Sequence, residues 1–295
     1  MINEAMKKEA EKYSVPYEKM GRQLVWHDEF DKDTIDFDKW CFKRTMGADD
    51  REYDNSEKYC RVEEGKAHLQ VWRSEKEDAN FALSEGFCTM DTMNFKYGYL
   101  EMRACVPFRH GAWPSFWMKS NTPFAKCPWM CETDIFEVFS SDRNAVCNLH
   151  KWGFGKHCML PGGEGSITRA YTFEKYENLN NEYHVYGFEW DELEMNFYVD
   201  GEKYSTFPID PVKGNFYPEV IDGTEGFHDF QYIIYNNEIF SEGSGWKPEG
   251  SALTDEDEMP IDYYIDYIRL YQKQGEEIKF KDEIAAAKAE KEAAK

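Results

Sequence analysis

A strand-like run at residues 128–139 limits the folds open to this chain, because it sets three carboxylates among apolar and aromatic side chains. Its threonine, isoleucine, phenylalanine and valine residues favour a pleated, buried strand, and no glycine or proline interrupts them after Pro128. A buried carboxylate without a partner destabilises a fold by several kcal/mol. Three on one strand therefore indicate a functional site within a β-rich protein.

Strand geometry decides which of the three carboxylates share a face. Side chains alternate along a strand, so Glu132 and Asp134 point the same way, whereas Glu137 would point to the opposite face of a regular strand. One extra residue, a β-bulge at Ile135 or Phe136, returns Glu137 to the face of the other two. We therefore predict a bulged and curved strand here.

Two glutamates with an aspartate between them suit the cleavage of a glycosidic bond. In a retaining hydrolase the two carboxyls lie about 5 to 5.5 Å apart, and one attacks the anomeric carbon while the other protonates the leaving oxygen. Crowded like charges raise at least one pKa, which keeps an acid protonated near neutral pH. We predict Glu132 as the nucleophile, Asp134 as its hydrogen-bonding partner and Glu137 as the acid/base.

The surroundings of the three carboxylates support this interpretation more than their spacing does. Asp and Glu make up 57 of the 295 residues, so three acids at these offsets would arise by chance in about two windows. Tryptophans precede the acidic run at residues 128–139. A stretch with a histidine and a tryptophan follows it, and strand alternation places Asn148, His150 and Trp152 on one face. Core packing is the alternative for the tryptophans, and a structural role is the alternative for the histidine. The residues expected to contact a substrate are Trp113, Trp117, Trp129, Asn148, His150 and Trp152.

The acidic composition argues against several kinds of partner. A formal net charge of -22 disfavours nucleic acids and anionic membranes, because both need a basic surface, and it also disfavours heavily sulfated polysaccharides. An aromatic content of 17%, with nine tryptophans, suits stacking on sugar rings. No run reaches the roughly 18 apolar residues of a membrane span. We expect a monomer that binds neither nucleic acid nor membrane.

The eight cysteines do not form a recognisable metal or redox motif, because no Cys-x-x-Cys occurs. Cys127, Cys131 and Cys158 with His157 are a candidate zinc set, but their spacing is irregular. We expect reduced and mostly buried thiols instead.

Short runs that alternate apolar and polar residues recur between glycine, proline, asparagine and aspartate breaks, which predicts antiparallel strands packed on one side. These runs lie at residues 67–72, 97–106, 183–190, 194–199, 230–235 and 263–271.

We expect three segments. They are a solvated leader at residues 1–20, an all-β sandwich at 21–273 with a glycine-rich rim or lid at 153–182, and a charged helical tail at 274–295. The leader lacks the apolar run of a secretory signal, so a secreted protein with its signal removed and an intracellular protein both remain open.

The chain resembles glycoside hydrolase family 16, the laminarinase and lichenase group, across roughly residues 21–273. An ordered set of motifs carries the resemblance: Trp26–Asp31, the Gly-x-Trp-Pro-x-Phe-Trp-Met run at Gly111–Met118, the Glu132-x-Asp134-x-x-Glu137 signature, His184–Trp190, Tyr198–Gly201 and Ile265–Tyr271. It implies a concanavalin A-like β-jelly roll with a substrate cleft across its concave sheet. It also implies retaining endo-hydrolysis of a β-linked polysaccharide, with the roles given above for the three carboxylates.

The resemblance bears on cofactors as well. Many family members hold a structural calcium between their first and last strands, and Glu29 and Asp266 lie in the matching segments of this chain. A surface acid and an ordinary strand-end aspartate are the alternative. No cofactor is expected for catalysis.

Departures from the laminarinase pattern leave the substrate open. Cys131 and Thr133 replace a glycine and an aliphatic residue, Trp129 lies closer to the signature than usual, and residues 236–238 replace a glycine-rich strand end. We expect an endo-β-glucanase acting on β-1,3-glucan or mixed β-1,3/1,4-glucan, a neutral polymer that suits the negative charge. The alternatives are a hydrolase of agarose, porphyran, carrageenan or a host glycan, a xyloglucan-type transglycosylase, a non-catalytic carbohydrate-binding sandwich, and a structural protein whose acids bind calcium.

Overall fold

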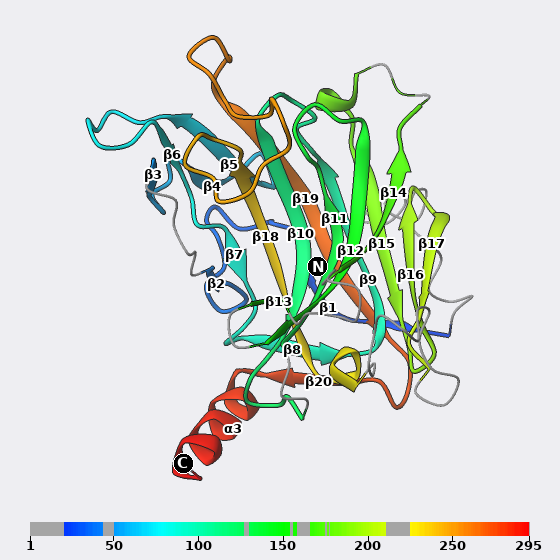
Figure 1. The fold of residues 1–295 in the computed structure, drawn as a ribbon. Helices are drawn as coiled ribbons and strands as arrows, with labels where there is room; N and C mark the ends of the chain where they lie inside the picture. Colours follow the sequence, from blue (N-terminus) through cyan, green and yellow to red (C-terminus); the bar gives the residue numbers. More distant parts are fainter. Residues whose placement is uncertain are drawn as a thin grey trace.

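The computed structural model describes residues 21–43, 50–126, 130–153, 156–157, 166–174, 176, 178–210 and 225–294. Over these residues the chain forms two sheets of ten strands each and a single α-helix, α3 (Lys281–Ala293), near the C-terminus (Figure 1). Pairing is antiparallel throughout, apart from one short parallel pair. That helix lacks the length and apolarity needed to cross a bilayer. Two short 3-10 turns, η1 (Leu179–Asn181) and η2 (Glu225–His228), lie in connections.

The first sheet has a main path of eight strands, with two more strands paired beside it. In spatial order the path is β17 (Glu202–Pro208), β16 (Glu194–Val199), β15 (His184–Trp190), β9 (Gly98–Cys105), β19 (Ile261–Gln272), β5 (Lys66–Arg73), β6 (Phe81–Leu83) and β3 (Arg51–Tyr53), while β1 (Gln23–Asp28) pairs with β19 and β4 (Cys60–Glu63) pairs with β5.

The second sheet carries the acidic run on β11. Its main path is β13 (Lys156–His157), β12 (Asn144–Gly153), β11 (Met130–Glu137), β10 (Ala112–Ser120), β18 (Gln231–Ile239), β7 (Phe87–Cys88) and β2 (Cys41–Phe42), while β14 (Ser166–Thr172) pairs with β12, β8 (Met93–Lys96) pairs with β18, and β20 (Glu277–Phe280) pairs with β8.

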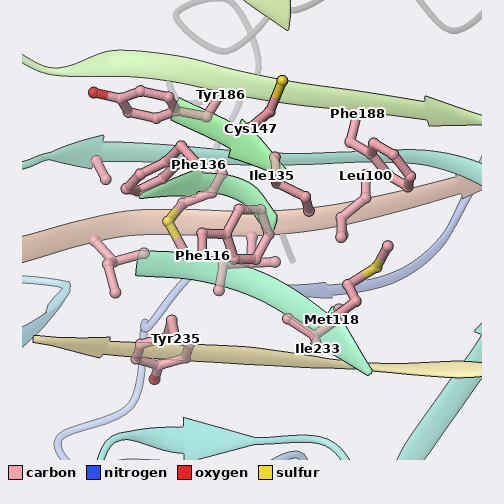
Figure 2. Close-up of a cluster of buried hydrophobic side chains, with 14 of the residues drawn as sticks. Leu100, Phe116, Met118, Ile135, Phe136, Cys147, Tyr186, Phe188, Ile233 and Tyr235 are labelled. Carbon is pink, nitrogen blue, oxygen red and sulfur yellow. The ribbon is translucent and has the colours of Figure 1, made fainter. Parts of the chain in front are cut away.

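The hydrophobic core lies between the two sheets, as the alternating runs predicted. Phe136 of the second sheet packs against Tyr186 of the first, with 4.1 Å between their ring centroids. Figure 2 shows side chains from both sheets meeting in this cluster. Phe116 and Met118 of β10 are fully buried, whereas Trp117 between them is not. The predicted all-β jelly-roll sandwich is therefore confirmed, and the opposite face of the second sheet is left to carry polar side chains.

The C-terminal segment differs in part from the expected solvated helix. Residues Glu277–Phe280 form β20, whose Ile278 packs against the core cluster, before helix α3 begins. Ile284 of the helix is also buried. Two isoleucines in a charged segment supplied enough apolar area to dock it. The expected leader, at residues 1–20, and most of the expected rim lie outside the described residues.

Candidate active site

The ladder between β10 and β11 confirms the predicted bulge. Asp134 lies opposite Trp117 and Phe136 lies opposite Phe116, so Ile135 is the extra residue. Ile135 and Phe136 are both buried in the core cluster, although they are consecutive (Figure 2). Because two neighbours point inward, the last carboxylate of the run returns to the face of the first two.

Glu132 forms an ion pair with a lysine on the neighbouring strand. Lys119 lies directly opposite Glu132, and its Nζ is 3.1 Å from Oε2 of the carboxylate. The two side chains are only 23% and 13% exposed, so solvent screens the pair weakly. Burial and the charge of Asp134 raise the pKa of Glu132, while Lys119 and His150 oppose that rise. Lys119 therefore favours the ionised form that a nucleophile needs.

Asp134, in the middle of the run, faces an imidazole. The Nε2 atom of His150 on β12 lies 3.0 Å from Oδ2 of Asp134. Burial lowers the pKa of His150, but Asp134 and the two glutamates outweigh it and raise that pKa to about 9. The imidazole is therefore positively charged at neutral pH and partly balances the three carboxylates. Its ring stacks on Trp152, with centroids 5.8 Å apart.

Glu137 accepts one hydrogen bond at each carboxyl oxygen. The indole Nε1 of Trp113 donates to Oε1 at 2.8 Å, and the amide Nδ2 of Asn148 donates to Oε2 at 2.7 Å. Burial and the neighbouring Asp134 raise the pKa of Glu137 to about 8. A carboxyl with that pKa is mostly protonated at neutral pH and can donate a proton to a leaving oxygen.

The structure brings five of the six predicted substrate-contacting residues onto this face of the second sheet, in different ways. Trp113 and Asn148 bind Glu137 directly, and His150 and Trp152 stack beside Asp134. Contact of these residues with a substrate stays a prediction. The sixth, Trp129, lies outside the described residues.

Trp117 has neighbours that its sequence position did not suggest. Its Nε1 donates to Oδ1 of Asn236 at 2.9 Å, and Ser115 donates to the same oxygen at 3.0 Å. The ammonium groups of Lys119 and Lys43 lie 4.8 and 5.2 Å from the Trp117 ring centroid. The indole is thus held by an amide and covered by cations.

Sequence reasoning missed several residues of this site. Alternation along the strand could have identified Lys119, because this residue lies on the same face of β10 as Trp113 and Trp117. Trp246 carried no such signal, since it lies in a loop. It is 56% exposed, and its ring centroid lies 5.9 Å from that of Trp113. The ring of Phe240 also stacks on Trp113, with 4.8 Å between the centroids. Trp113, Phe240 and Trp246 thus form an aromatic wall beside Glu137.

The residues expected to hold calcium do not fit a cation. Glu29 accepts two hydrogen bonds of 2.8 Å from the guanidinium of Arg269, and Asp266 accepts one of 2.6 Å from Arg103. A calcium site needs several oxygen ligands converging on one point, whereas each of these carboxylates already faces an arginine. The sequence could not anticipate this, because the arginines come from β19 and β9.

Over the described ranges, the one cluster of histidine and acidic groups close enough to hold a metal is Glu132, Asp134 and His150, within 4.8 Å of one another. These groups belong to the site just described. Two members of the candidate zinc set, Cys127 and Cys158, lie outside the described residues. Among the described residues, the cysteines that form no disulfide are Cys41, Cys60, Cys88, Cys105, Cys131 and Cys147.

Comparisons with known proteins agree with this geometry. The sequence profile described as Glycosyl hydrolases family 16 matches residues 49–230. The glucan endo-1,3-beta-glucosidase A1 of Niallia circulans is 26% identical over 274 residues, which cover 86% of this chain but only 38% of that protein. The beta-glucanase of Rhodothermus marinus is 26% identical, with 85% of each chain covered. The chain thus spans less than half of the first relative.

A solved structure shows the same fold. The laminarinase catalytic domain from Thermotoga maritima superposes with a TM-score of 0.67 and 26% identity, covering 86% of this chain and 99% of that one. The profile match spans more than half of the residues and includes the bulged acidic strand. The resemblance inferred from the motifs is therefore confirmed, and this chain belongs to glycosyl hydrolases family 16.

Proposed function

We propose that this chain is a retaining endo-hydrolase of a β-glucan with β-1,3 or mixed β-1,3/1,4 linkages. The observation that carries the proposal is the contrast between the two glutamates that the bulge places on one face. Glu132 lies against the ammonium of Lys119, which favours a charged nucleophile. Glu137, with its pKa raised to about 8, is held as a protonated acid.

These groups supply a two-step displacement. In the first step Glu137 gives its proton to the glycosidic oxygen while the Glu132 carboxylate attacks the anomeric carbon, which forms a glycosyl ester and releases one end of the polymer. In the second step the Glu137 carboxylate takes a proton from water, the water oxygen attacks the same carbon, and Glu132 leaves as a carboxylate.

Asp134 and His150 adjust the charge around these steps. Glu132 attacks as a carboxylate and is neutral in the ester, so the net charge of the site changes by one unit during the first step. The imidazolium of His150, 3.0 Å from Asp134, holds a positive charge beside that change. Asp134 lies close to Glu132 and can accept a hydrogen bond from a donor such as a sugar hydroxyl.

The relatives support the choice of glucan. One is named a glucan endo-1,3-beta-glucosidase, and another, covered over 85% of its length, is named a beta-glucanase. The chain's overall negative charge also suits a polymer whose backbone is neutral.

The test is a reducing-sugar assay on laminarin, barley mixed-linkage glucan, xyloglucan, agarose and carrageenan, run with wild type and Glu132→Gln. We expect release from one of the first two polymers and none from the variant. Proton NMR of the earliest products should show the β-anomer, because two displacements restore the configuration. Equal turnover by the variant, initial α-anomer, or cleavage confined to a galactan would contradict the proposal.

An added acceptor oligosaccharide separates hydrolysis from transglycosylation. Hydrolysis leaves the product distribution unchanged, whereas a transglycosylase would lengthen the acceptor. Binding of glucan by both proteins with no cleavage by either would identify a non-catalytic sandwich instead.

A further inference from the structure

Two lysine ammonium groups gather over the indole of Trp117, beside Glu132. Lys119 comes from β10 itself, and Lys43 directly follows β2, three strands away in the order β10-β18-β7-β2. Their Nζ atoms lie 4.8 and 5.2 Å from the Trp117 ring centroid. The fold thus brings two ammonium groups from distant parts of the chain to one indole.

Lys43 has no counterion of its own in the part of the chain that the structure describes. The two carboxylates that act on it, Glu238 and Glu132, are each bound to another cation. Arg51 donates to Glu238 at 2.8 Å, and Lys119 lies 3.1 Å from Glu132. The Lys43 side chain is half-buried, and its ammonium contacts the Trp117 ring but no anion of its own, which is less favourable than an ion pair.

The charge around Lys43 also opposes its own ionisation. Burial, and then the neighbouring charge of Lys119, lower the pKa of Lys43 against the opposing effect of Glu238. An additional negative group at this point would relieve both the desolvation and the repulsion between the two ammoniums.

Catalysis would strengthen the demand for an anion. When Glu132 becomes a glycosyl ester it loses its charge, and Lys119 then loses its carboxylate partner. For the lifetime of that intermediate, Glu132 no longer balances the charge of the two ammoniums beside the indole. A neutral sugar placed on the covered face would have to displace a cation from the ring, which costs a cation–π contact.

We propose that Lys43 and Lys119 form an anion subsite beside Trp117, which binds a carboxylate or sulfate carried by the sugar unit next to the nucleophile. This inference rests on the proposed function, because it takes Glu132 as the nucleophile. It refines the substrate from a neutral glucan to a β-glucan backbone with acidic substituents. The net charge of -22 disfavours a polymer that is heavily charged along its whole length, whereas a single acidic group at this subsite meets mainly the two lysines, because charges elsewhere on the surface are screened beyond about 8 Å at physiological salt.

The test compares polymers that share a β-1,3-glucan backbone and differ only in charge. They are laminarin, curdlan oxidised at C6 so that its units carry carboxylates, and sulfated laminarin. Binding is measured by titration calorimetry in a Glu137→Gln background, which prevents hydrolysis and leaves the two lysines intact. Lys43→Met is compared with Lys43→Arg, which keeps the charge, and with Lys32→Met, which removes a surface lysine that pairs with Asp36.

We expect one of the acidic polymers to bind more tightly than laminarin, and the stronger of the two identifies carboxylate or sulfate as the preferred group. Lys43→Met should weaken that binding about tenfold, the effect of one charge-assisted hydrogen bond, while laminarin binding changes less than about twofold. Lys43→Arg and Lys32→Met should behave like the parent. Added NaCl should weaken binding of the acidic polymer alone. Equal affinity for charged and neutral polymers, or equal losses for both in Lys43→Met, would overturn the proposal.

A second measurement separates this inference from the proposed function. Inorganic sulfate and acetate are titrated against the intact chain while tryptophan emission is followed, with Trp117→Phe and Lys43→Met as controls. Saturable quenching that both substitutions abolish would support the anion subsite even if no glucan were bound or cleaved. A response that survives both substitutions, or none at all, would refute the subsite even if glucan were hydrolysed.

Discussion

Lys119 and Glu132 face each other across β10 and β11, with 3.1 Å between the lysine Nζ and the carboxylate Oε2. The pair joins the strand that carries the tryptophans to the strand that carries the acids. Since both side chains are largely buried, little water screens the lysine charge, and that charge lowers the pKa of the Glu132 carboxyl. That relationship sets the acidic side of the expected pH profile.

Replacing Lys119 with methionine should move the acidic limb of the kcat/KM profile to higher pH. Lys119 lowers the pKa of Glu132, so its removal raises that pKa, and the carboxylate is then protonated at a higher pH as acid is added. A full profile of kcat/KM against pH measures the shift. Lys119→Arg should restore the parent limb, because it keeps the positive charge. A loss of activity that is uniform across pH would instead indicate a structural role.

Glu137 should set the basic limb of the same profile, with activity falling above about pH 8 as the acid loses its proton. Glu137→Gln should lower kcat about 10² to 10⁴-fold on a polymer. On an aryl glucoside whose leaving group needs no protonation, the first step should be nearly unaffected. Equal losses on both substrates would show that Glu137 is not the acid.

Trp113→Phe should shift that basic limb upward. The indole donates a hydrogen bond to the Glu137 carboxylate and so favours the charged form, which means that its loss raises the pKa of Glu137 further. The acid then stays protonated to higher pH. Trp246→Phe, which alters the same aromatic wall without touching Glu137, serves as the control. A limb that moves equally in both variants would argue against the hydrogen bond as the cause.

Deleting Ile135 should destabilise the fold and still leave measurable activity. The shortened run alternates regularly, so Glu132, Asp134 and Glu137 keep one face, while the core loses a buried isoleucine, which costs about 2–5 kcal/mol in the free energy of unfolding. Ile135→Val, which keeps the bulge, should lower that free energy by only about 0.5–1.5 kcal/mol. Urea unfolding and the reducing-sugar assay measure the two effects, and a deletion variant that folds but cleaves no polymer would contradict alternation as the rule that decides the face of Glu137.

The buried pair of Glu29 and Arg269 should matter for stability rather than for metal binding. Arg269→Met removes the two hydrogen bonds that Glu29 accepts from the guanidinium and leaves it only His27, so we expect a loss of about 3–5 kcal/mol in the free energy of unfolding. Although burial opposes ionisation, His27 and Arg269 hold the pKa of Glu29 below its ordinary value. This contribution is therefore complete above the unfolded pKa and is lost as pH falls through the folded one. Thermal unfolding with calcium and with a chelator should give one Tm, and a Tm raised by calcium would contradict the arginine pairing.

The acidic strand could be deduced from local pattern alone, because alternation has a fixed period of two and the five-residue interval from Glu132 to Glu137 cannot be regular. The same rule placed Asn148, His150 and Trp152 on one face of β12. The sandwich followed from the recurrence of alternating runs. The bulge, the shared face of β12 and the alternating strands all depend on the order of neighbouring residues, so a short stretch of sequence is enough to predict each of them.

Contacts between distant segments could not be deduced in that way. Lys43 reaches Trp117 across three strand pairings, Asn236 accepts from Trp117 across the β10–β18 pairing, and Trp246 joins the aromatic wall from a loop. Arginines from two other strands occupy the carboxylates that the motifs had suggested for calcium. Which side chains meet here depends on strand order and register. Those are set by the packing of the whole core, and no local stretch of sequence encodes them.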